Sequence, residues 1–263
     1  ITRGRLVTLS EWLDALPAGL LEQYPNFISF KGTIATTRGE VSEGLRLLDQ
    51  AIAGLRKNGD TPGLTFALQR RGFAYIIAGR YTDAINDTDE VLKLVRPEER
   101  VCPVYAHSLF AKGISLAYLG ELYEALSYLK DALDVYQVLK DENSESKVWI
   151  EMGRTNKMLG NYAEAEVGYK KALENIQAIS DLLLQANLNN SLGVLQHVQG
   201  DYVAAISSFE KAVHYAKLGG SPRLEAYVLA SIGDMYQELD AYREAFEAYH
   251  QARDIAQRIR DDY

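Results

Sequence analysis

The apolar positions of the chain recur in helical runs with a period of about 40 residues. The runs end at glycines separated by 40, 41, 40 and 40 residues, and a sixth run ends at an aspartate another 40 residues on. The six positions are Gly39, Gly79, Gly120, Gly160, Gly200 and Asp240. Self-similarity at a fixed period is the signature of a repeat architecture, in which each repeat buries its apolar face on its neighbours. The pattern therefore predicts six repeats rather than one central core.

Small residues hold fixed places around each of these six positions. Another glycine lies seven residues earlier: Gly32, Gly72, Gly113, Gly153, Gly193 and Gly233. Small residues lie five residues later: Gly44, Ala84, Ala125, Ala165, Ala205 and Ala245. Twelve residues later stand Ala51, Val91, Ala132, Ala172, Ala212 and Ala252. A glycine after an apolar run favours a left-handed helix end, and residues seven apart share a helix face. Each repeat is therefore predicted to be two helices, A and B, that cross at the small residues.

The predicted fold is all-α, with twelve paired helices and a different N-terminal segment. Helix pairs are expected at 26–38 and 41–57, 62–78 and 81–95, 102–119 and 122–139, 144–159 and 162–179, 182–199 and 202–217, and 222–238 and 242–259. Residues 1–25 are expected to form a helical cap or linker. The six repeats are placed at about 26–60, 61–99, 100–141, 142–180, 181–220 and 221–263.

Residues that typically begin or end helices refine the expected helix boundaries. Thr61 and Ser221 each precede a proline and are expected to cap the A helices that follow. The pair Gly219-Gly220 is expected to end a B helix, and the polar run 141–146 to form a surface turn.

The glycine, aromatic and alanine spacing resembles the tetratricopeptide repeat, whose usual period is about 34 residues. The aromatic position, two residues after the second glycine, carries Tyr81, Leu122, Tyr162, Tyr202 and Tyr242 in five of six copies. We expect these residues to fill the corner between helices A and B as part of the core. The resemblance implies a right-handed superhelix (an α-solenoid) of six helix pairs plus the N-terminal cap. It also implies a concave face, lined by A helices, that binds a protein, a peptide or a small-molecule effector.

A second resemblance rests on the residues before the repeats. The pattern W-L-x-A-L-P from Trp12 to Pro17 continues to Leu20, Leu21 and Pro25 and then enters the repeats. It resembles the sensor region of MalT-like regulators, the large ATP-binding members of the LuxR-type transcription factors. This implies a sensor or docking domain of a bacterial signal-responsive transcriptional regulator. The alternative is a tetratricopeptide scaffold from another multidomain signalling protein that binds a peptide or a partner protein.

Composition and motif searches limit the chemistry. The net charge is -8, with 36 acidic and 28 basic residues, which disfavours direct contact with nucleic acid. A single cysteine, Cys102, excludes an internal disulfide and fits the cytoplasm. No apolar run of about 20 residues predicts a membrane helix. The chain starts at Ile1 rather than at methionine, so we expect a piece of a longer protein.

Catalytic and nucleotide-binding patterns are not recognisable in the sequence. No P-loop or recognition helix occurs, so this chain is not expected to hydrolyse ATP or bind an operator. The four histidines, His107, His197, His214 and His250, fall in positions that form no metal-ligand cluster. We therefore expect no enzyme activity, no cofactor and no metal, and we leave self-association open.

Candidate binding residues follow from the repeat register. The inner wall of a tetratricopeptide array is expected at fixed places around the first glycine of each A helix. These places are apolar in the second and third repeats and polar in later ones: Phe66, Phe73, Phe110, Arg154, Lys157, Asn187, Asn190, His197, Tyr227 and Asp234. Such a surface suits a small polar effector or an acidic peptide. The alternative is that neighbouring A helices bury the phenylalanines and that the polar residues face solvent without a ligand.

Overall fold

The structure, a computed structural model, describes residues 3–176 and 181–259. Within these ranges the chain forms α-helices and one short 3-10 helix, and no strand. Every paired helix starts within two residues of its predicted start. The all-α, tetratricopeptide-like fold is therefore confirmed. Residues 1–2, 177–180 and 260–263, which belong to the predicted cap and to the fourth and sixth predicted repeats, lie outside the described residues.

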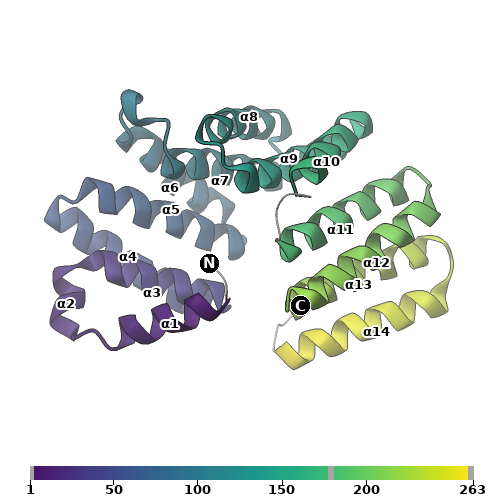
Figure 1. The fold of residues 1–263 in the computed structure, drawn as a ribbon, viewed down its shortest axis with the longest axis horizontal. Coiled ribbons are helices and arrows are strands. Elements are labelled where there is room, and N and C mark those ends of the chain that lie inside the picture. The colour runs from purple at the N-terminus through teal and green to yellow at the C-terminus, as the bar shows by residue number, and fades with distance from the viewer. Residues whose placement is uncertain (1–2, 177–180, 260–263) are drawn as a thin grey trace. The chain divides into compact units, whose positions relative to one another are not determined.

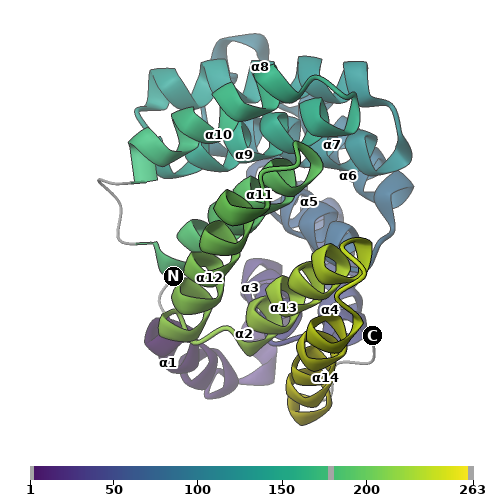
Figure 2. The same cartoon turned by 90° about the vertical axis from the view of Figure 1, so that its right-hand side faces the viewer.

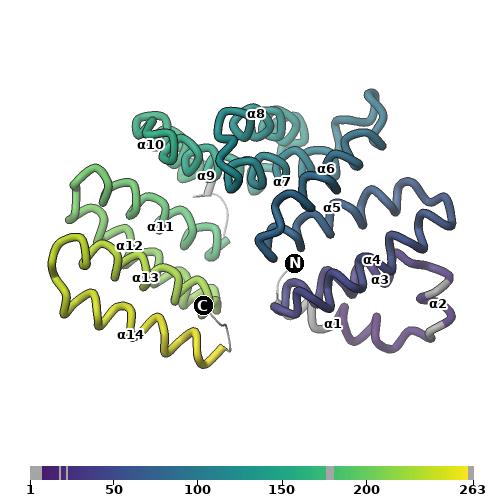
Figure 3. Tube along the Cα trace, turned by 180° about the vertical axis from the view of Figure 1, so that it is seen from behind, coloured from purple at the N-terminus to yellow at the C-terminus, as the bar shows by residue number. Residues whose placement is uncertain are grey.

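The chain packs as two compact units, residues 1–140 and residues 141–263, which we call unit 1 and unit 2. Unit 1 begins with two short helices, α1 (Arg3–Asp14) and α2 (Ala18–Gln23), and continues as consecutive antiparallel pairs (Figures 1 and 3). These pairs are α3 (Pro25–Thr37) with α4 (Val41–Asn58), α5 (Thr61–Ile77) with α6 (Tyr81–Leu94), and α7 (Pro103–Leu119) with α8 (Leu122–Leu139). The 3-10 helix Pro97–Glu99 lies between the last two pairs.

Unit 2 contains three further pairs of the same kind, two of which stand in the foreground of Figure 2. They are α9 (Glu142–Met158) with α10 (Tyr162–Ile176), α11 (Leu182–Val198) with α12 (Tyr202–Leu218), and α13 (Pro222–Glu238) with α14 (Tyr242–Ile259). Odd-numbered helices from α3 to α13 are thus the A helices, and even-numbered helices from α4 to α14 are the B helices.

The second glycine of each repeat ends helix A in a left-handed conformation, as the sequence predicts. Gly39 has a φ of 89° and Gly120 a φ of 90°. Asp240, which replaces glycine in the last repeat, adopts the same region with a φ of 56°. Aspartate tolerates this region better than most side chains because its short polar group can bond locally. The helix-end role of this position is confirmed in both units.

The first glycine lets helix B approach helix A closely. A Cβ atom added to Gly153 would lie 2.5 Å from Cε1 of Tyr169 on α10. The crossing alanines Ala125, Ala165 and Ala205 are fully buried. The crossing is less crowded at Gly72, where the nearest atom to an added Cβ, in the side chain of Thr88, is 3.6 Å away. The predicted crossing therefore holds, with one loosely filled copy in unit 1.

The observed helix starts contradict two of the sequence predictions and confirm a third. Asp60, not Thr61, caps α5, because its carboxylate accepts the N–H of Gly63 at 2.9 Å and Thr61 is already helical. Asp141 caps α9, so most of the polar run 141–146 is the first turn of a helix rather than a surface turn. Aspartate competes well for this role because a carboxylate satisfies unpaired N–H groups at the helix start. The Ser221 cap of α13 is confirmed.

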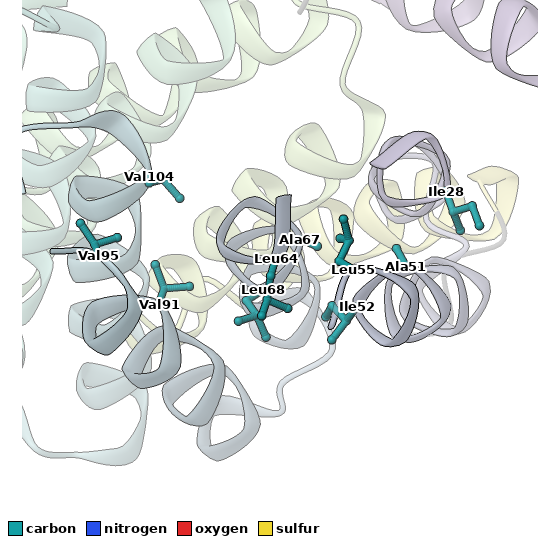
Figure 4. Packing of buried hydrophobic residues seen from close by; sticks show 10 residues of the cluster. All are labelled: Ile28, Ala51, Ile52, Leu55, Leu64, Ala67, Leu68, Val91, Val95 and Val104. Carbon is teal, nitrogen blue, oxygen red and sulfur yellow. The ribbon is translucent and has the colours of Figure 1, made fainter. Parts of the chain in front are cut away.

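The core of unit 1 runs between consecutive helix pairs. Figure 4 shows side chains of α5 between those of α4 on one side and those of α6 and α7 on the other. The cluster comprises Ile28, Ala51, Ile52, Leu55, Leu64, Ala67, Leu68, Val91, Val95 and Val104. Each pair thus buries its apolar face against the next pair, as expected for a repeat protein.

The tyrosines that open the B helices lie further out than expected. Tyr162, Tyr202 and Tyr242 are exposed, the last to 66%. Each is the first residue of its helix. The expectation that these three residues belong to the core is therefore wrong. At the same position of unit 1, Tyr81 is half-buried and stacks on Tyr118, and Leu122 packs against a core cluster. Tyr169, one turn beyond the crossing alanine of α10, is a true core residue.

The A helices line the inner side of each unit. In unit 1, α3 contacts α5 and α5 contacts α7; in unit 2, α9 contacts α11 and α11 contacts α13. No comparable contact joins two B helices in the described ranges. Within each unit the A helices are therefore closer together than the B helices. None of the described helices is both long and apolar enough to cross a membrane.

Candidate functional site

The inner side of unit 1 carries the predicted phenylalanines, but only one of them is open. Phe73 on α5 and Phe110 on α7 pack together with ring centroids 6.4 Å apart. Phe110 is only 8% exposed, whereas Phe66, which lies two turns before Phe73 on α5, is 46% exposed. Burial between neighbouring A helices therefore explains Phe110, and Phe66 is the accessible aromatic group.

The cations of unit 1 are bound within the unit. Arg71 contacts the carboxylates of Asp49 and Asp87, each at 2.6 Å, and Lys112 contacts Asp89 at 2.6 Å. Burial raises the pKa of the Asp87 carboxyl, and the Arg71 guanidinium opposes that rise. These pairs join neighbouring helices, which indicates a structural role.

Arg70 on α5 contacts neutral groups rather than a carboxylate. It donates to Oγ of Ser29 at 2.7 Å and lies over the ring of Phe30, 4.0 Å from its centroid. Burial lowers the pKa of its guanidinium. Its contacts tie α5 to α3, and it adds a positive charge beside an aromatic surface.

Helix α9 of unit 2 carries the two predicted cations, Arg154 and Lys157, three residues apart. Arg154 forms an ion pair with Glu151 on the same helix, and the Glu151 side chain is 17% exposed. Lys157 is half-buried, and burial together with the positive charge of Arg154 lowers the pKa of its ammonium group. Among residues 3–176 and 181–259, no carboxylate pairs with Lys157. Glu151 therefore pairs with Arg154 and not with Lys157.

Helices α10 and α11 complete a polar cluster around Glu151. Burial, followed by the nearby charge of Glu151, raises the pKa of the Tyr169 hydroxyl, and the charge of Arg154 opposes that rise. Ser191 of α11 lies near Tyr169 of α10 and favours the ionised form of its hydroxyl, which lowers its pKa. Side chains from α9, α10 and α11 thus meet at one place.

Asn190 on α11 has an unmet hydrogen-bonding need. It is 6% exposed, and its Oδ1 is buried and accepts no hydrogen bond within the described residues. The adjacent Asn189 differs, because its Nδ2 donates to the carbonyl oxygen of Gln185 at 2.8 Å. Asn187 is exposed, and its Nδ2 donates to the carbonyl of Leu183 at 3.0 Å. Asn190 therefore carries a buried amide oxygen that accepts no hydrogen bond among the described residues, whereas Asn187 and Asn189 bond through their amide nitrogens.

The repeat register relates Arg154 and Asn190. They stand one residue after the first glycine of α9 and three before that of α11. Phe73 and Phe110 hold the same two places in unit 1, where they touch across neighbouring A helices. Because the backbone plan is the same, we infer that Arg154 and Asn190 face the same inner surface.

The remaining predicted residues are held by α13 and α14. Nε2 of His197 lies 3.0 Å from Oε2 of Glu238. Asp234 accepts a hydrogen bond of 2.7 Å from the hydroxyl of Tyr249, and burial followed by this bond raises the pKa of Tyr249 to about 12. Tyr227 on α13 is exposed. His197 and Asp234 therefore have internal partners, unlike Lys157.

Sequence reasoning missed Glu151, which lies directly beside the predicted cations. The signal was available, since Glu151 precedes Arg154 by three residues, the spacing at which opposite charges meet on a helix. In the part of the chain that the structure describes, no group of three or more His, Cys, Asp or Glu residues is placed to hold a metal ion. The cluster offers cations and a carbonyl acceptor, which suit hydrogen bonding to a polar ligand.

Comparison with known proteins identifies the class of fold. The family model described as the tetratricopeptide repeat matches residues 104–178 and 144–217. No curated protein matches the sequence. The chain thus contains tetratricopeptide repeats, as the glycine and alanine spacing predicts.

Solved structures with the same fold include two complexes. The Rap protein complexed with competence and sporulation factor has a TM-score of 0.76 at 16% identity, covering 96% of this chain and 80% of that one. NprR in complex with its cognate peptide NprX has a TM-score of 0.73 at 14% identity, covering 92% and 69%. BtubC from P. vanneervenii has a TM-score of 0.65 at 16% identity, covering 85% and 93%. At sequence identities this low, the structural similarity shows a common fold alone.

Proposed function

We propose that unit 2 binds a peptide along the inner side of α9 and α11. The buried Oδ1 of Asn190, which accepts no hydrogen bond among the described residues, carries this proposal. An unmet buried polar group costs about 1–3 kcal/mol, so it calls for a physical explanation. In the proposed complex the Asn190 side chain turns toward the ligand, and the backbone N–H of a bound peptide supplies the missing donor.

Two of the similar structures support a peptide as ligand. Rap is complexed with competence and sporulation factor, and NprR is complexed with its cognate peptide NprX. We extend peptide binding from those proteins to this chain because the helix pairs are of the same kind. The proposed activity is binding rather than catalysis.

We further propose that the chain is the sensor or docking part of a bacterial signal-responsive regulator. The W-L-x-A-L-P pattern at Trp12–Pro17 supports a regulator of the MalT-like type, whereas the similar folds support a peptide-sensing regulator. The two types differ outside this chain. A P-loop module before the repeats and a helix-turn-helix module after them in the full reading frame would favour the MalT-like type.

A random heptapeptide library provides the test of peptide binding. Peptides retained by the protein are synthesised with a fluorophore, and their affinities are measured by fluorescence anisotropy. Asn190→Ala should weaken them about tenfold, the effect of one lost hydrogen bond of roughly 1.4 kcal/mol. The melting temperature should stay close to wild type, because the native protein loses no internal bond to Oδ1.

Asn189→Ala is the matched control. It removes a buried asparagine from the same helix, but one whose amide is bound to its own helix backbone. Peptide affinity should change less than about twofold in this variant. A library that yields no binding peptide, or equal affinities for wild type and Asn190→Ala, would rule out the proposed function at this site.

A further inference from the structure

The ion pair between Glu151 and Arg154 gives the inner side of unit 2 a carboxylate of its own. Glu151 is on the same helix as Arg154 and three residues before it, and its side chain is largely buried. Tyr169 of α10 is the titratable group facing it from the second helix, and the uncharged Ser191 faces the cluster from α11. His197 of α11 instead contacts Glu238. Glu151 thus has one close cationic partner, Arg154.

The charges around Glu151 do not balance. The positive charge of Arg154 disfavours the charged form of Lys157, and among residues 3–176 and 181–259 Lys157 pairs with no carboxylate, whereas Arg154 pairs with Glu151. In a half-buried place, where water screens poorly, an uncompensated cation is costly. A second carboxylate beside Lys157 would relieve this cost, and it would also contact Arg154.

We propose that Glu151 is a resident carboxylate that holds Arg154 in the free protein, and that a ligand carboxylate takes its place on Arg154 while pairing with Lys157. This inference rests on the proposed peptide binding and specifies its chemistry. The ligand is an acidic peptide, and its carboxylate is that of an Asp or Glu side chain or of the C-terminus. Glu151 then sets the affinity by competition.

Competition of this kind couples binding to protonation. Burial raises the pKa of Glu151 in the free protein, and its pairing with Arg154 opposes that rise. Loss of Arg154 to the ligand removes the opposing effect, so the pKa of Glu151 rises further in the complex. A group whose pKa rises on binding takes up a proton, and the ligand therefore binds more tightly as the pH falls. Free peptide carboxylates titrate near 4, so they stay ionised above about pH 5.5.

The test uses one acidic heptapeptide selected by the wild-type protein and two neutralised forms of it. In one form Asp and Glu are replaced by Asn and Gln, and in the other the C-terminus is amidated. Glu151→Gln, which keeps the size of the side chain, should bind the acidic peptide about tenfold more tightly. Lys157→Gln should bind it about tenfold more weakly. The form whose neutralisation abolishes both effects identifies the source of the carboxylate.

Lys170→Gln is the matched charge control, because Lys170 lies on α10, is exposed, and pairs with Glu166 at 2.7 Å. It should leave every affinity within about twofold, the small effect of an exposed charge. Between about pH 7.5 and 5.5 the wild type should gain affinity for the acidic peptide, while Glu151→Gln should show a flat profile. That profile separates displacement of Glu151 from simple repulsion.

The outcomes separate this inference from the proposed function. In one outcome, Asn190→Ala weakens peptide binding while Glu151→Gln changes the affinities of the acidic and the neutralised peptides equally. That result overturns the resident-carboxylate proposal and leaves the proposed peptide binding intact. Selection of peptides without any need for a carboxylate does the same. Failure of all heptapeptides to bind overturns both.

Discussion

Units 1 and 2 are built on one backbone plan, yet they differ at the position just before the first glycine of each A helix. In unit 1 this position carries Lys31, Arg71 and Lys112, each of which contacts an aspartate on an earlier helix. In unit 2 the same position carries Met152, Leu192 and Ile232. Charged contacts thus join neighbouring helices in unit 1, where unit 2 uses apolar ones.

The cations of unit 2 stand elsewhere in the repeat. Arg154 and Lys157 lie one and four residues after the first glycine of α9; Arg154 pairs with Glu151 on its own helix, and Lys157 pairs with no carboxylate among the described residues. A cation placed between helices is neutralised by the fold. We propose that the Lys157 ammonium instead serves a ligand. The repeat plan fixes the small residues and leaves these other positions free to carry a binding surface.

The largest expected effect comes from breaking a helix-joining pair in unit 1. Arg71→Met leaves the buried Asp87 without its cation and should lower the free energy of unfolding by about 3–5 kcal/mol in urea titrations. Lys157→Met is the matched change in unit 2, where the cation pairs with no carboxylate among the described residues. It should change the free energy of unfolding by less than about 1 kcal/mol. Equal losses in the two variants would erase the difference between the units.

The loss in Arg71→Met should also depend on pH. Burial already raises the pKa of Asp87, and removal of Arg71 raises it further, so the native state binds a proton more readily than the unfolded chain does. Stability of the variant therefore recovers as the pH falls toward that pKa. The deficit should be largest near neutral pH and smaller at about pH 5.

A moderate effect is expected where the two units agree. Ala165→Leu places a larger side chain at the fully buried crossing of α9 and α10 and should cost about 1–3 kcal/mol of unfolding free energy. Ala125→Leu in unit 1 should cost a similar amount for the same reason. The exposed Ala163 on α10 serves as the control, since leucine there meets no close packing. An unchanged melting temperature in Ala165→Leu would show that the crossing has been misplaced.

The smallest expected effect on stability comes from replacing the first glycine of a repeat, which is loosely packed in one copy of unit 1 and tightly packed in unit 2. An added Cβ at Gly72 in unit 1 would meet only ordinary contacts, so Gly72→Ala should stabilise the helix by about 0.4–1 kcal/mol. At Gly153 in unit 2 the added Cβ would meet the Tyr169 ring at 2.5 Å, so Gly153→Ala should destabilise instead. Thermal unfolding of the two variants should shift in opposite directions. A shift of the same sign in both would contradict the packing difference.

The fold was predictable from the sequence because small residues mark close approaches that admit few substitutes. Gly153 and Ala165 mark the crossing directly, and Asp240 shows that the left-handed helix end tolerates exchange of its glycine. Helix caps were less certain, since Asp60 and Thr61 are neighbours that can both cap a helix, and the choice depends on backbone geometry.

The candidate site was predictable only in part. The register placed Arg154 and Lys157 on the inner wall, but it could not show that Glu151 folds back onto Arg154, which depends on the local exclusion of water. Burial of Phe110 and exposure of Phe66 likewise depend on how closely neighbouring A helices approach. The same residue positions recur in every repeat, but the neighbouring helix determines how exposed the side chain at each position is.

The inner side of α9 and α11 as the peptide site is tested most directly by mapping a selected heptapeptide onto the isotopically labelled protein by NMR. Backbone and side-chain shifts should change most at Arg154, Lys157 and Asn190, with saturation at the affinity measured by anisotropy. The outer B helices, for example Lys170 and Lys211, should remain unchanged. Largest changes on those outer helices, or on the Phe66 wall of unit 1 alone, would contradict a peptide site on the inner side of unit 2.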